Sequence, residues 1–201
     1  MIGLIGKKLG MTQIFAENGE LIPVTIISAT PNLVIHRKTQ ESNGYDAHIL
    51  GTRETKNPNR PYSGIFKKVG VKPTFLLREI RNSPSDWKIG KEVTLSIFSP
   101  DSKVRVTGSS KGRGFQGVVK RHGFHGGPGA HGSKFHRHPG SIGTSKTPSK
   151  VIKGHLMPGR MGNQKITIKN LKIVKTDIDR NLLFLKGSVP GAPNSWVLIK
   201  Q

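Results

Sequence analysis

Apolar and β-branched residues occur in short runs towards both ends of the chain, and Gly, Pro, Asn or Ser bounds each run. Runs of this length, several with apolar and polar positions in alternation, predict β-strands. The predicted strands are 21–27, 32–37, 93–97, 103–107, 166–169, 182–185 and 196–199. Many short strands separated by turns are typical of a closed β-barrel or a β-sandwich, so we expect a mainly β protein.

Turn residues mark how some of these strands connect. Asn18-Gly19, between Phe15 and Leu21, is a signal for a type I′ hairpin. The sequence Asp-Arg-Asn at 179–181 can turn the chain between two further strands. Residues 54–90 contain prolines, and the pattern near 63–69 predicts a short helix, so we expect an irregular or helical insertion within the β domain.

A different pattern fills the segment from Gly108 to Gly162, which holds 14 of the 25 glycines and few large apolar residues. Such a segment cannot bury enough apolar surface to fold alone, and a disordered linker is one interpretation. Apolar residues are nevertheless dispersed along it, which a flexible linker does not require. We therefore expect two parts: a β-barrel domain of 1–107 with 164–201, and a long Gly/Lys/Arg/His-rich loop extension of 108–163 that folds against its partner.

Charge identifies the chemistry of that partner. The 201 residues include 33 Lys and Arg against 11 Asp and Glu, a net charge of +22. No carboxylate occurs between Asp101 and Asp177, a stretch of 75 residues that contains 16 Lys and Arg. So many cations without acidic neighbours need negative charge from another molecule, and nucleic-acid phosphate is its usual source. A membrane surface fits less well, because a Gly-rich stretch does not form a long amphipathic helix.

Composition excludes several other classes of protein. The chain has no cysteine, which rules out a disulfide scaffold, a Cys-ligated zinc site and a thiol nucleophile. No apolar run approaches the roughly 18 residues of a membrane span, and the N-terminus lacks the order of a signal peptide. We expect a cytoplasmic protein without cofactor, membrane contact or small-molecule substrate.

Two patterns in the Gly-rich segment resemble enzyme motifs, and neither is well supported. Residues 112–117 match the letters of the dinucleotide-binding fingerprint, but the acidic residue expected about 20 positions later is replaced by Arg137. Six of the eight histidines lie within 122–155, at spacings that could ligate a metal. No carboxylate is present there to orient them, whereas histidine also stacks on bases and contacts phosphate. We expect no catalytic residues and no metal site.

Five segments in order along the chain carry a resemblance to a known family. They are 2–15, 108–117 with Arg121, 139–143, 161–163 and 181–191. In these segments the chain resembles the bacterial type of the L3 family of universal large-subunit ribosomal proteins. The resemblance implies a translation-protein-type β-barrel and a basic limb that runs through ribosomal RNA (rRNA) towards the peptidyl transferase centre. It further implies a structural protein, not an enzyme, that binds large-subunit rRNA directly, acts early in subunit assembly and touches neighbouring ribosomal proteins.

The candidate rRNA-binding residues combine cations that neutralise phosphates, glycines that permit close approach of the backbone, and histidines that stack. They are Lys103, Arg105, Lys111, Gly112, Arg113, Gly114, Lys120, Arg121, His122, His125, Lys134, His136, Arg137, His138, Ser141, Lys146, Lys150, Lys153 and Arg160. The resemblance puts 111–117, Lys120 and Arg121 at the root of the limb and 141–148 near its tip.

The chain departs from the family pattern at two positions. Arg105 stands where the family usually has Asp or Asn, which adds positive charge at the root of the limb. Lys146 stands where many bacterial members carry a methylated Gln, so we expect no modification at this position.

Two alternatives from other classes remain open at this stage. The first is a nucleoid-type DNA-binding protein, which would prefer duplex DNA to structured RNA. The second is a metal-dependent enzyme built on the histidine cluster, which would hold stoichiometric metal.

Overall fold

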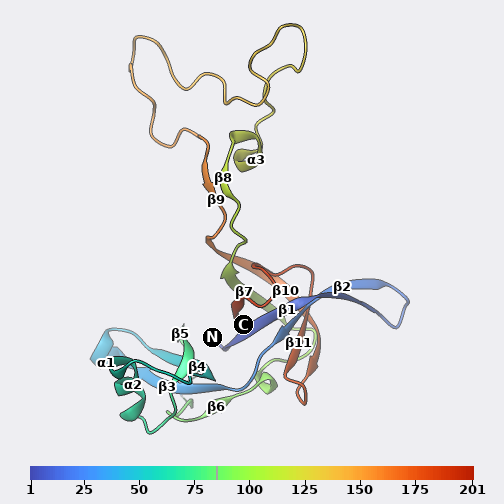
Figure 1. The fold of residues 1–201 in the computed structure, drawn as a ribbon. Coiled ribbons are helices and arrows are strands. Elements are labelled where there is room, and N and C mark those ends of the chain that lie inside the picture. The colour runs from blue at the N-terminus through green and yellow to red at the C-terminus, as the bar shows by residue number, and fades with distance from the viewer. Residues whose placement is uncertain (85) are drawn as a thin grey trace. The chain divides into compact units, whose positions relative to one another are not determined.

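In the computed structural model, which describes residues 1–84 and 86–201, six antiparallel strands close into a barrel (Figure 1). Their order around the barrel is β1 (Gly3–Phe15), β12 (Trp196–Lys200), β7 (Lys103–Ser109), β10 (Lys165–Asp177), β11 (Leu182–Lys186) and β2 (Leu21–Ser28). Successive side chains of a strand point to opposite faces, so the alternation of apolar and polar residues gives a strand one buried face and one more exposed face. On β7, Val104 and Val106 are buried, whereas Arg105 and Thr107 are only half-buried. The prediction of a mainly β protein is therefore confirmed.

A second sheet of four strands has the order β5-β4-β3-β6, again antiparallel throughout. The strands are β3 (Asn32–Lys38), β4 (Ala47–Glu54), β5 (Thr74–Arg81) and β6 (Glu92–Val93), with helices α1 (Gln40–Asn43) and α2 (Arg60–Lys67) in the connections. The buried side chains of this sheet and of the barrel form one apolar cluster, in which Leu50 and Ile80 pack with barrel residues such as Leu4 and Ile199.

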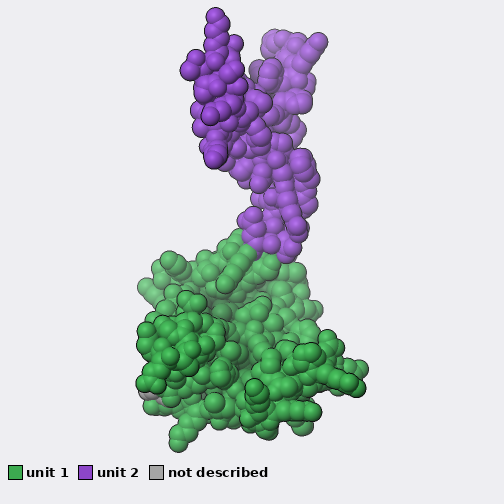
Figure 2. All heavy atoms as spheres, turned by 90° about the vertical axis from the view of Figure 1, so that its left-hand side faces the viewer, with its two compact units in different colours: residues 1–110, 165–201 green, residues 111–164 purple. Residues whose placement is uncertain are grey.

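The chain divides into two compact units, coloured separately in Figure 2. Unit 1 comprises residues 1–110 and 165–201 and contains both sheets. Unit 2 comprises residues 111–164 and contains β8 (Gly114–Gln116), β9 (Gly159–Met161) and α3 (Val118–His122). Among the described residues, no helix has the length and apolarity needed to cross a membrane.

The predicted strand at 93–97 is wrong. The strand β6 ends at Val93, and residues Leu95–Ile97 form a 3-10 helix, η1. Leu95 and Phe98 are both buried, three residues apart, which is the repeat of a 3-10 helix. The apolar spacing over 93–97 is compatible with either a strand or a 3-10 helix. Burial of both Leu95 and Phe98 in the core favours the 3-10 helix.

Segment 54–90 contains more regular structure than its composition indicates. The helix α2 covers part of the predicted helical region, and β5 is a full strand of eight residues that the sequence did not predict. The strand at 32–37 was predicted correctly, but it belongs to the second sheet and not to the barrel. Strands β1 and β4 were also not predicted from the apolar pattern.

The hairpin between β1 and β2 forms where Asn18-Gly19 predicted it, but with a different turn. Phe15 pairs with Leu21, and the amide of Gly19 donates to the carbonyl of Ala16 at 2.9 Å. A type I′ turn needs positive φ at both central residues, and here Gly19 has φ +79° while Asn18 does not have positive φ. The loop between the paired residues Phe15 and Leu21 is five residues long, so the chain can turn without a positive φ at Asn18.

Buried Asn32 connects the second sheet to the barrel. Pairing of β1 with β2 begins at Lys7, so that edge of β1 is open at Ile5. The side chain of Asn32 fills the gap: its oxygen accepts from the Ile5 amide at 2.9 Å, and its nitrogen donates to the Ile5 carbonyl at 3.1 Å. The same nitrogen donates to the carbonyl of Thr30 at 2.7 Å. One side chain thus satisfies backbone groups that would otherwise be buried without partners.

We predict that Asn32→Ala lowers the free energy of unfolding by about 2 to 4 kcal/mol, because it leaves buried backbone groups at Ile5 without hydrogen bonds. Chemical denaturation of the full chain measures this change. Asn57→Ala, at an exposed loop asparagine, is the control and should change stability by less than about 0.5 kcal/mol. Equal effects of the two variants would contradict the role of Asn32.

A second buried polar group, His48 on β4, makes stability depend on pH. Its Nδ1 lies 2.6 Å from the hydroxyl oxygen of Ser83, and its ring lies edge-on to Trp87 with centroids 5.8 Å apart. Burial lowers the pKa of His48 below its ordinary value of 6.5. The unfolded chain therefore takes up this proton first as the pH falls, so the stability that neutral His48 contributes is complete above about pH 6.5 and declines below it.

We predict that the protein loses stability between about pH 7.5 and about pH 5.5, and that His48→Gln reduces this loss. Denaturant titrations at the two pH values give the difference for each variant. His36→Gln, at an exposed histidine of β3, serves as the control and should retain the dependence of the parent protein. A His48→Gln variant with an unchanged pH dependence would refute this assignment.

Candidate nucleic-acid interface

Unit 2 begins and ends in a short two-stranded ladder. β8 pairs with β9 so that Phe115 lies opposite Arg160, and the amide of Arg113 donates to the carbonyl of Met161 at 2.9 Å. The Phe115 side chain is 75% exposed, and Arg113 and Arg160 are exposed as well. An exposed aromatic ring among guanidinium groups is an arrangement that suits unpaired bases and phosphates.

The helix α3 follows this ladder and concentrates positive charge in its last turn. Lys120 is exposed, whereas Arg121 and His122 are half-buried. The guanidinium of Arg121 donates to the carbonyl of Met157 at 2.5 Å, and His122 Nε2 lies 3.1 Å from the same oxygen. These two candidate residues therefore also hold the returning chain of unit 2 against α3.

Hydrogen bonds within the loop order the histidine-rich part of unit 2. The amide of Gly127 donates to the carbonyl of His136 at 2.7 Å, and the amide of His138 donates to the carbonyl of Phe135 at 2.7 Å. This part of the loop surrounds a hollow of about 440 Å³, whose lining includes Phe124, Phe135 and His138. Aromatic and imidazole rings beside an open hollow offer stacking surfaces.

Residues 141–150 are exposed throughout. Two hydroxyl groups organise the backbone locally: Ser141 donates to the carbonyl of Gly143 at 3.0 Å, and Thr144 donates to the carbonyl of Thr147 at 2.9 Å. Lys146 lies within the second of these turns. Its ammonium group is therefore carried on a locally ordered backbone.

None of the 19 predicted residues is buried. Sixteen are exposed, and Arg105, Arg121 and His122 are half-buried. Within the described chain, none of the ion pairs involves a residue of unit 2, and residues 102–176 contain no carboxylate. The positive charge of unit 2 thus faces solvent without internal compensation.

Lys103 and Arg105 belong to unit 1, because β7 is a barrel strand. Arg105 lies directly opposite Lys200 of β12. The candidate set did not include Lys200, since only the strand register brings it to Arg105. The sequence does indicate that the Lys200 side chain points outward, because Lys200 stands at an outward position of an alternating strand, but it does not indicate which strand lies beside it.

The histidines were also considered as metal ligands. In the described part of the chain, no three His, Asp or Glu side chains are grouped closely enough to hold a metal ion. His122 and the Phe124 ring contact each other, with centroids 6.2 Å apart, and His122 also faces the Met157 carbonyl. The geometry offers rings and hydrogen-bond donors rather than a ligand set.

The ladder at the start of unit 2 depends on a close approach at Gly162. This residue has φ +76°, and a Cβ there would lie 2.1 Å from the carbonyl oxygen of Lys111. We predict that Gly162→Ala opens the ladder, at a cost of about 1 to 3 kcal/mol, and speeds exchange of the Arg113 amide at least about tenfold. Hydrogen exchange followed by NMR measures this rate.

Gly112→Ala is the matched control, because a Cβ at that position would meet only Asn163 Cβ, at 3.8 Å. The exchange rate of the Arg113 amide should then stay near that of the parent protein. Equal acceleration in both variants would show that the close approach at Gly162 does not govern the ladder.

The closed barrel, together with a Gly-rich unit whose cations have no acidic partners, defines a class: mainly β, strongly basic proteins with a surface suited to a polyanion. Comparison with known proteins narrows this class. A family model described as ribosomal protein L3 matches residues 85–181.

Three relatives, each named large ribosomal subunit protein uL3, match almost the whole chain. That of Geobacillus thermodenitrificans is 52% identical over 202 residues, covering 99% of this chain and 95% of the relative. That of Pelotomaculum thermopropionicum is 50% identical, with 99% and 96% covered, and that of Carboxydothermus hydrogenoformans is 51% identical, with 99% and 96% covered. The chain belongs to the ribosomal protein L3 family, whose members are structural proteins and not enzymes.

Proposed function

We propose that the protein is a structural constituent of the large ribosomal subunit that binds large-subunit rRNA directly through unit 2. One observation carries the proposal: unit 2 contains ten Lys and Arg, no Asp or Glu, and no ion pair within the described chain. RNA phosphates supply the missing negative charge, and counterions are released from the RNA when the cations of the protein bind these phosphates. The names of the relatives support the assignment to the large subunit in the cytoplasm.

The residues of unit 2 divide the work by chemistry. Lys111, Arg113 and Lys120 are exposed cations beside the β8–β9 ladder and α3, and they neutralise phosphates. Gly112 and Gly114 allow the backbone to approach the RNA closely. The exposed rings of Phe115, His125, His136 and His138 provide stacking surfaces for bases. This division predicts binding by RNA shape and charge more than by base sequence.

The family resemblance extends the proposal. It supports a barrel of the translation-protein type and a unit 2 that acts as a limb penetrating the rRNA. It also supports entry early in subunit assembly, contacts with neighbouring large-subunit proteins, and residues 141–148 directed towards the peptidyl transferase centre. In this arrangement Lys146 contacts phosphate as a point charge.

We predict that Lys111→Gln/Arg113→Gln makes the salt dependence of rRNA binding shallower by about 1.4 to 1.8 in log Kd per log salt, since each neutralised phosphate contributes about 0.7 to 0.9. Filter binding of the full chain to a large-subunit rRNA transcript, repeated over a series of salt concentrations, measures the slope.

Lys67→Gln/Lys68→Gln removes the same charge from exposed positions in and beside α2 and is the control. Its slope should match that of the parent protein. A parent protein that binds duplex DNA as tightly as the rRNA transcript would contradict the proposal and favour the DNA-binding alternative. An unchanged slope in the Lys111→Gln/Arg113→Gln variant would show that these two residues, beside the β8–β9 ladder, do not contact RNA phosphates.

A further inference from the structure

Unit 1 contains a small cationic hollow with a half-buried lysine in its wall. The hollow has a volume of about 500 Å³ and lies where β5, β7, β10 and β12 come together. Its polar lining includes the hydroxyl groups of Thr107 and Thr167 and the carboxylate of Glu79. Five basic residues line it: Arg78, Arg81, Arg105, Lys165 and Lys200. A hollow of this composition suits a small anion that carries several oxygen atoms.

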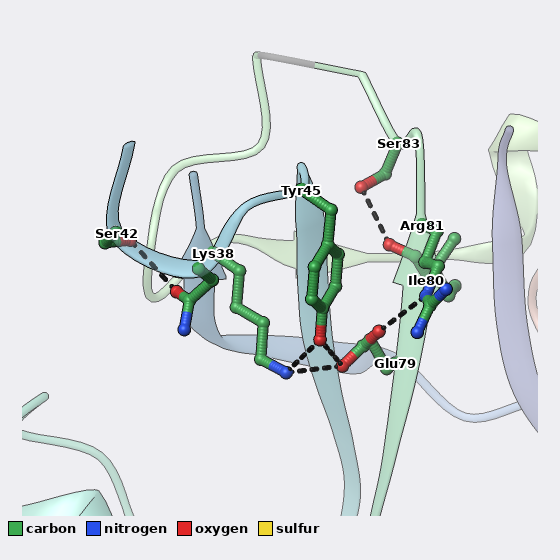
Figure 3. A network of polar contacts seen from close by, with 8 residues as sticks. Lys38, Ser42, Tyr45, Glu79, Ile80, Arg81 and Ser83 are labelled. Carbon is green, nitrogen blue, oxygen red and sulfur yellow. Dashed lines mark hydrogen bonds and ion pairs between the residues drawn. The ribbon is translucent and has the colours of Figure 1, made fainter. Parts of the chain in front are cut away.

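Glu79 does not neutralise these cations, because it already has partners (Figure 3). Lys38 donates to its carboxylate at 2.7 Å, and Arg81 donates to the other oxygen at 3.1 Å. The hydroxyl group of Tyr45 donates a third hydrogen bond at 3.1 Å. The pKa of Glu79 is lowered, chiefly by the hydrogen bond from Lys38, so the carboxylate stays charged and paired.

Two of the arginines are available to an anion. Arg78 donates only to the carbonyl of the preceding residue, Leu77, at 3.0 Å, and Arg105 contacts the sulfur of Met1. Neither guanidinium forms an ion pair within the described part of the chain. Guanidinium groups bind phosphate through parallel N–H donors, so the hollow offers a phosphate-sized anion its ordinary protein partners.

Strand register places Lys200 in an unusual position among these cations. Lys200 lies directly opposite Gly3 of β1, where a Cβ would come within 3.2 Å of Lys200 Cγ. The missing side chain at Gly3 thus leaves room for the stem of Lys200, which is half-buried. On its other side Lys200 lies directly opposite Arg105 of β7, and like charges in this position repel.

These surroundings favour the neutral amine of Lys200. Burial lowers the pKa of Lys200, and the positive charges of Arg105 and Lys165 lower it further. The charge of Glu79 opposes this shift in part, and that of Arg81 adds to it. A lysine that is desolvated and lies beside other cations is activated as a nucleophile, because the neutral amine is the form that attacks an electrophilic carbon.

We propose that the cationic hollow is a modification site, at which an acyl phosphate acylates Lys200 without an enzyme. The amine nitrogen attacks the acyl carbon, so that a C–N bond forms and the C–O bond to phosphate breaks. The phosphate leaves with the electron pair of that bond and takes up the proton that the nitrogen loses. The products are an amide on Lys200 and inorganic phosphate, and nothing is oxidised or reduced. The inference goes beyond the proposed function and does not depend on RNA binding.

The two ends of an acyl phosphate match two features of the hollow. Arg78 and Arg105 bind the phosphate, which places the acyl carbon beside the amine of Lys200. The acyl chain has room in an adjoining hollow of about 360 Å³, whose apolar wall includes Leu76 and Trp196. The two hollows share Arg78 in their linings. Acylation makes Lys200 neutral and ends its repulsion with Arg105, so the fold tolerates the product.

Acetylation of the full chain by acetyl phosphate tests the site. After the reaction the protein is unfolded, the remaining amines are labelled with deuterated acetic anhydride, and mass spectrometry gives the acetylated fraction of each lysine. Lys172 of β10 is the internal control, because it is exposed and forms an ion pair with Asp101 at 2.8 Å. We expect Lys200 to react at least about fivefold faster than Lys172. An equal or lower rate at Lys200 overturns the inference.

Arg78→Gln separates binding of the phosphate from reactivity of the amine. Arg78 lines the hollow, whereas the positive charges that lower the pKa of Lys200 are those of Arg105, Lys165 and Arg81. The variant should slow acetylation of Lys200 by acetyl phosphate at least about threefold, because a phosphate partner is lost. Its rate with p-nitrophenyl acetate, a neutral donor of the same acetyl group, should not change.

Arg37→Gln, at an exposed arginine of β3 that does not line the hollow, is the matched control and should change neither rate. If Arg78→Gln leaves the rate with acetyl phosphate unchanged, the hollow does not bind the donor, and the inference is overturned. An equal loss with both donors overturns it as well, because Arg78 would then act on Lys200 or on the fold and not on the phosphate.

Discussion

Pairing between β7 and β10 is the constraint on which the arrangement of this protein depends. The chain leaves the barrel after Ser109 and returns at Lys165, and these two residues are directly paired. Neighbouring strands thereby hold both ends of unit 2 together, so the barrel offsets the entropy of closing a loop of more than 50 residues. Closure of the barrel through β1 and β12 keeps β7 and β10 inside a continuous ring rather than at a free edge.

The two units differ in how they accommodate charge because they differ in packing. Unit 1 has an apolar core and can hold carboxylates in ion pairs, such as Glu79 with Lys38 at 2.7 Å and Asp101 with Lys172 at 2.8 Å. Unit 2 has little core and no carboxylate, and its order comes from backbone hydrogen bonds, glycines and two side chains that hold the Met157 carbonyl. Such a unit keeps its cations available to an external polyanion.

Alternation predicted the strands that face the core on one side only. Residues 103–107, 182–185 and 196–199 lie in β7, β11 and β12 as expected. Strand β1 was not predicted from the apolar pattern, because Gly3 and Gly6 interrupt that pattern. Both glycines are needed by tertiary contacts: a Cβ at Gly3 would lie 2.7 Å from the Ile199 oxygen, and one at Gly6 would lie 2.5 Å from Ile27. Periodicity also could not assign β3 to the second sheet, since strands of either sheet have the same local pattern.

The sequence by itself determined the family and indicated a polyanionic partner, because net charge, the absence of carboxylates over 102–176 and the matching segments are properties of the chain whatever its fold. It also identified the candidate residues of unit 2, all of them exposed or half-buried in the structure. Only the tertiary structure decided which cations lie together. Arg105 and Lys200 meet because β7 pairs with β12, and Arg78 joins them because the second sheet packs on the barrel. Register between distant strands is set by long-range packing, which no local pattern encodes.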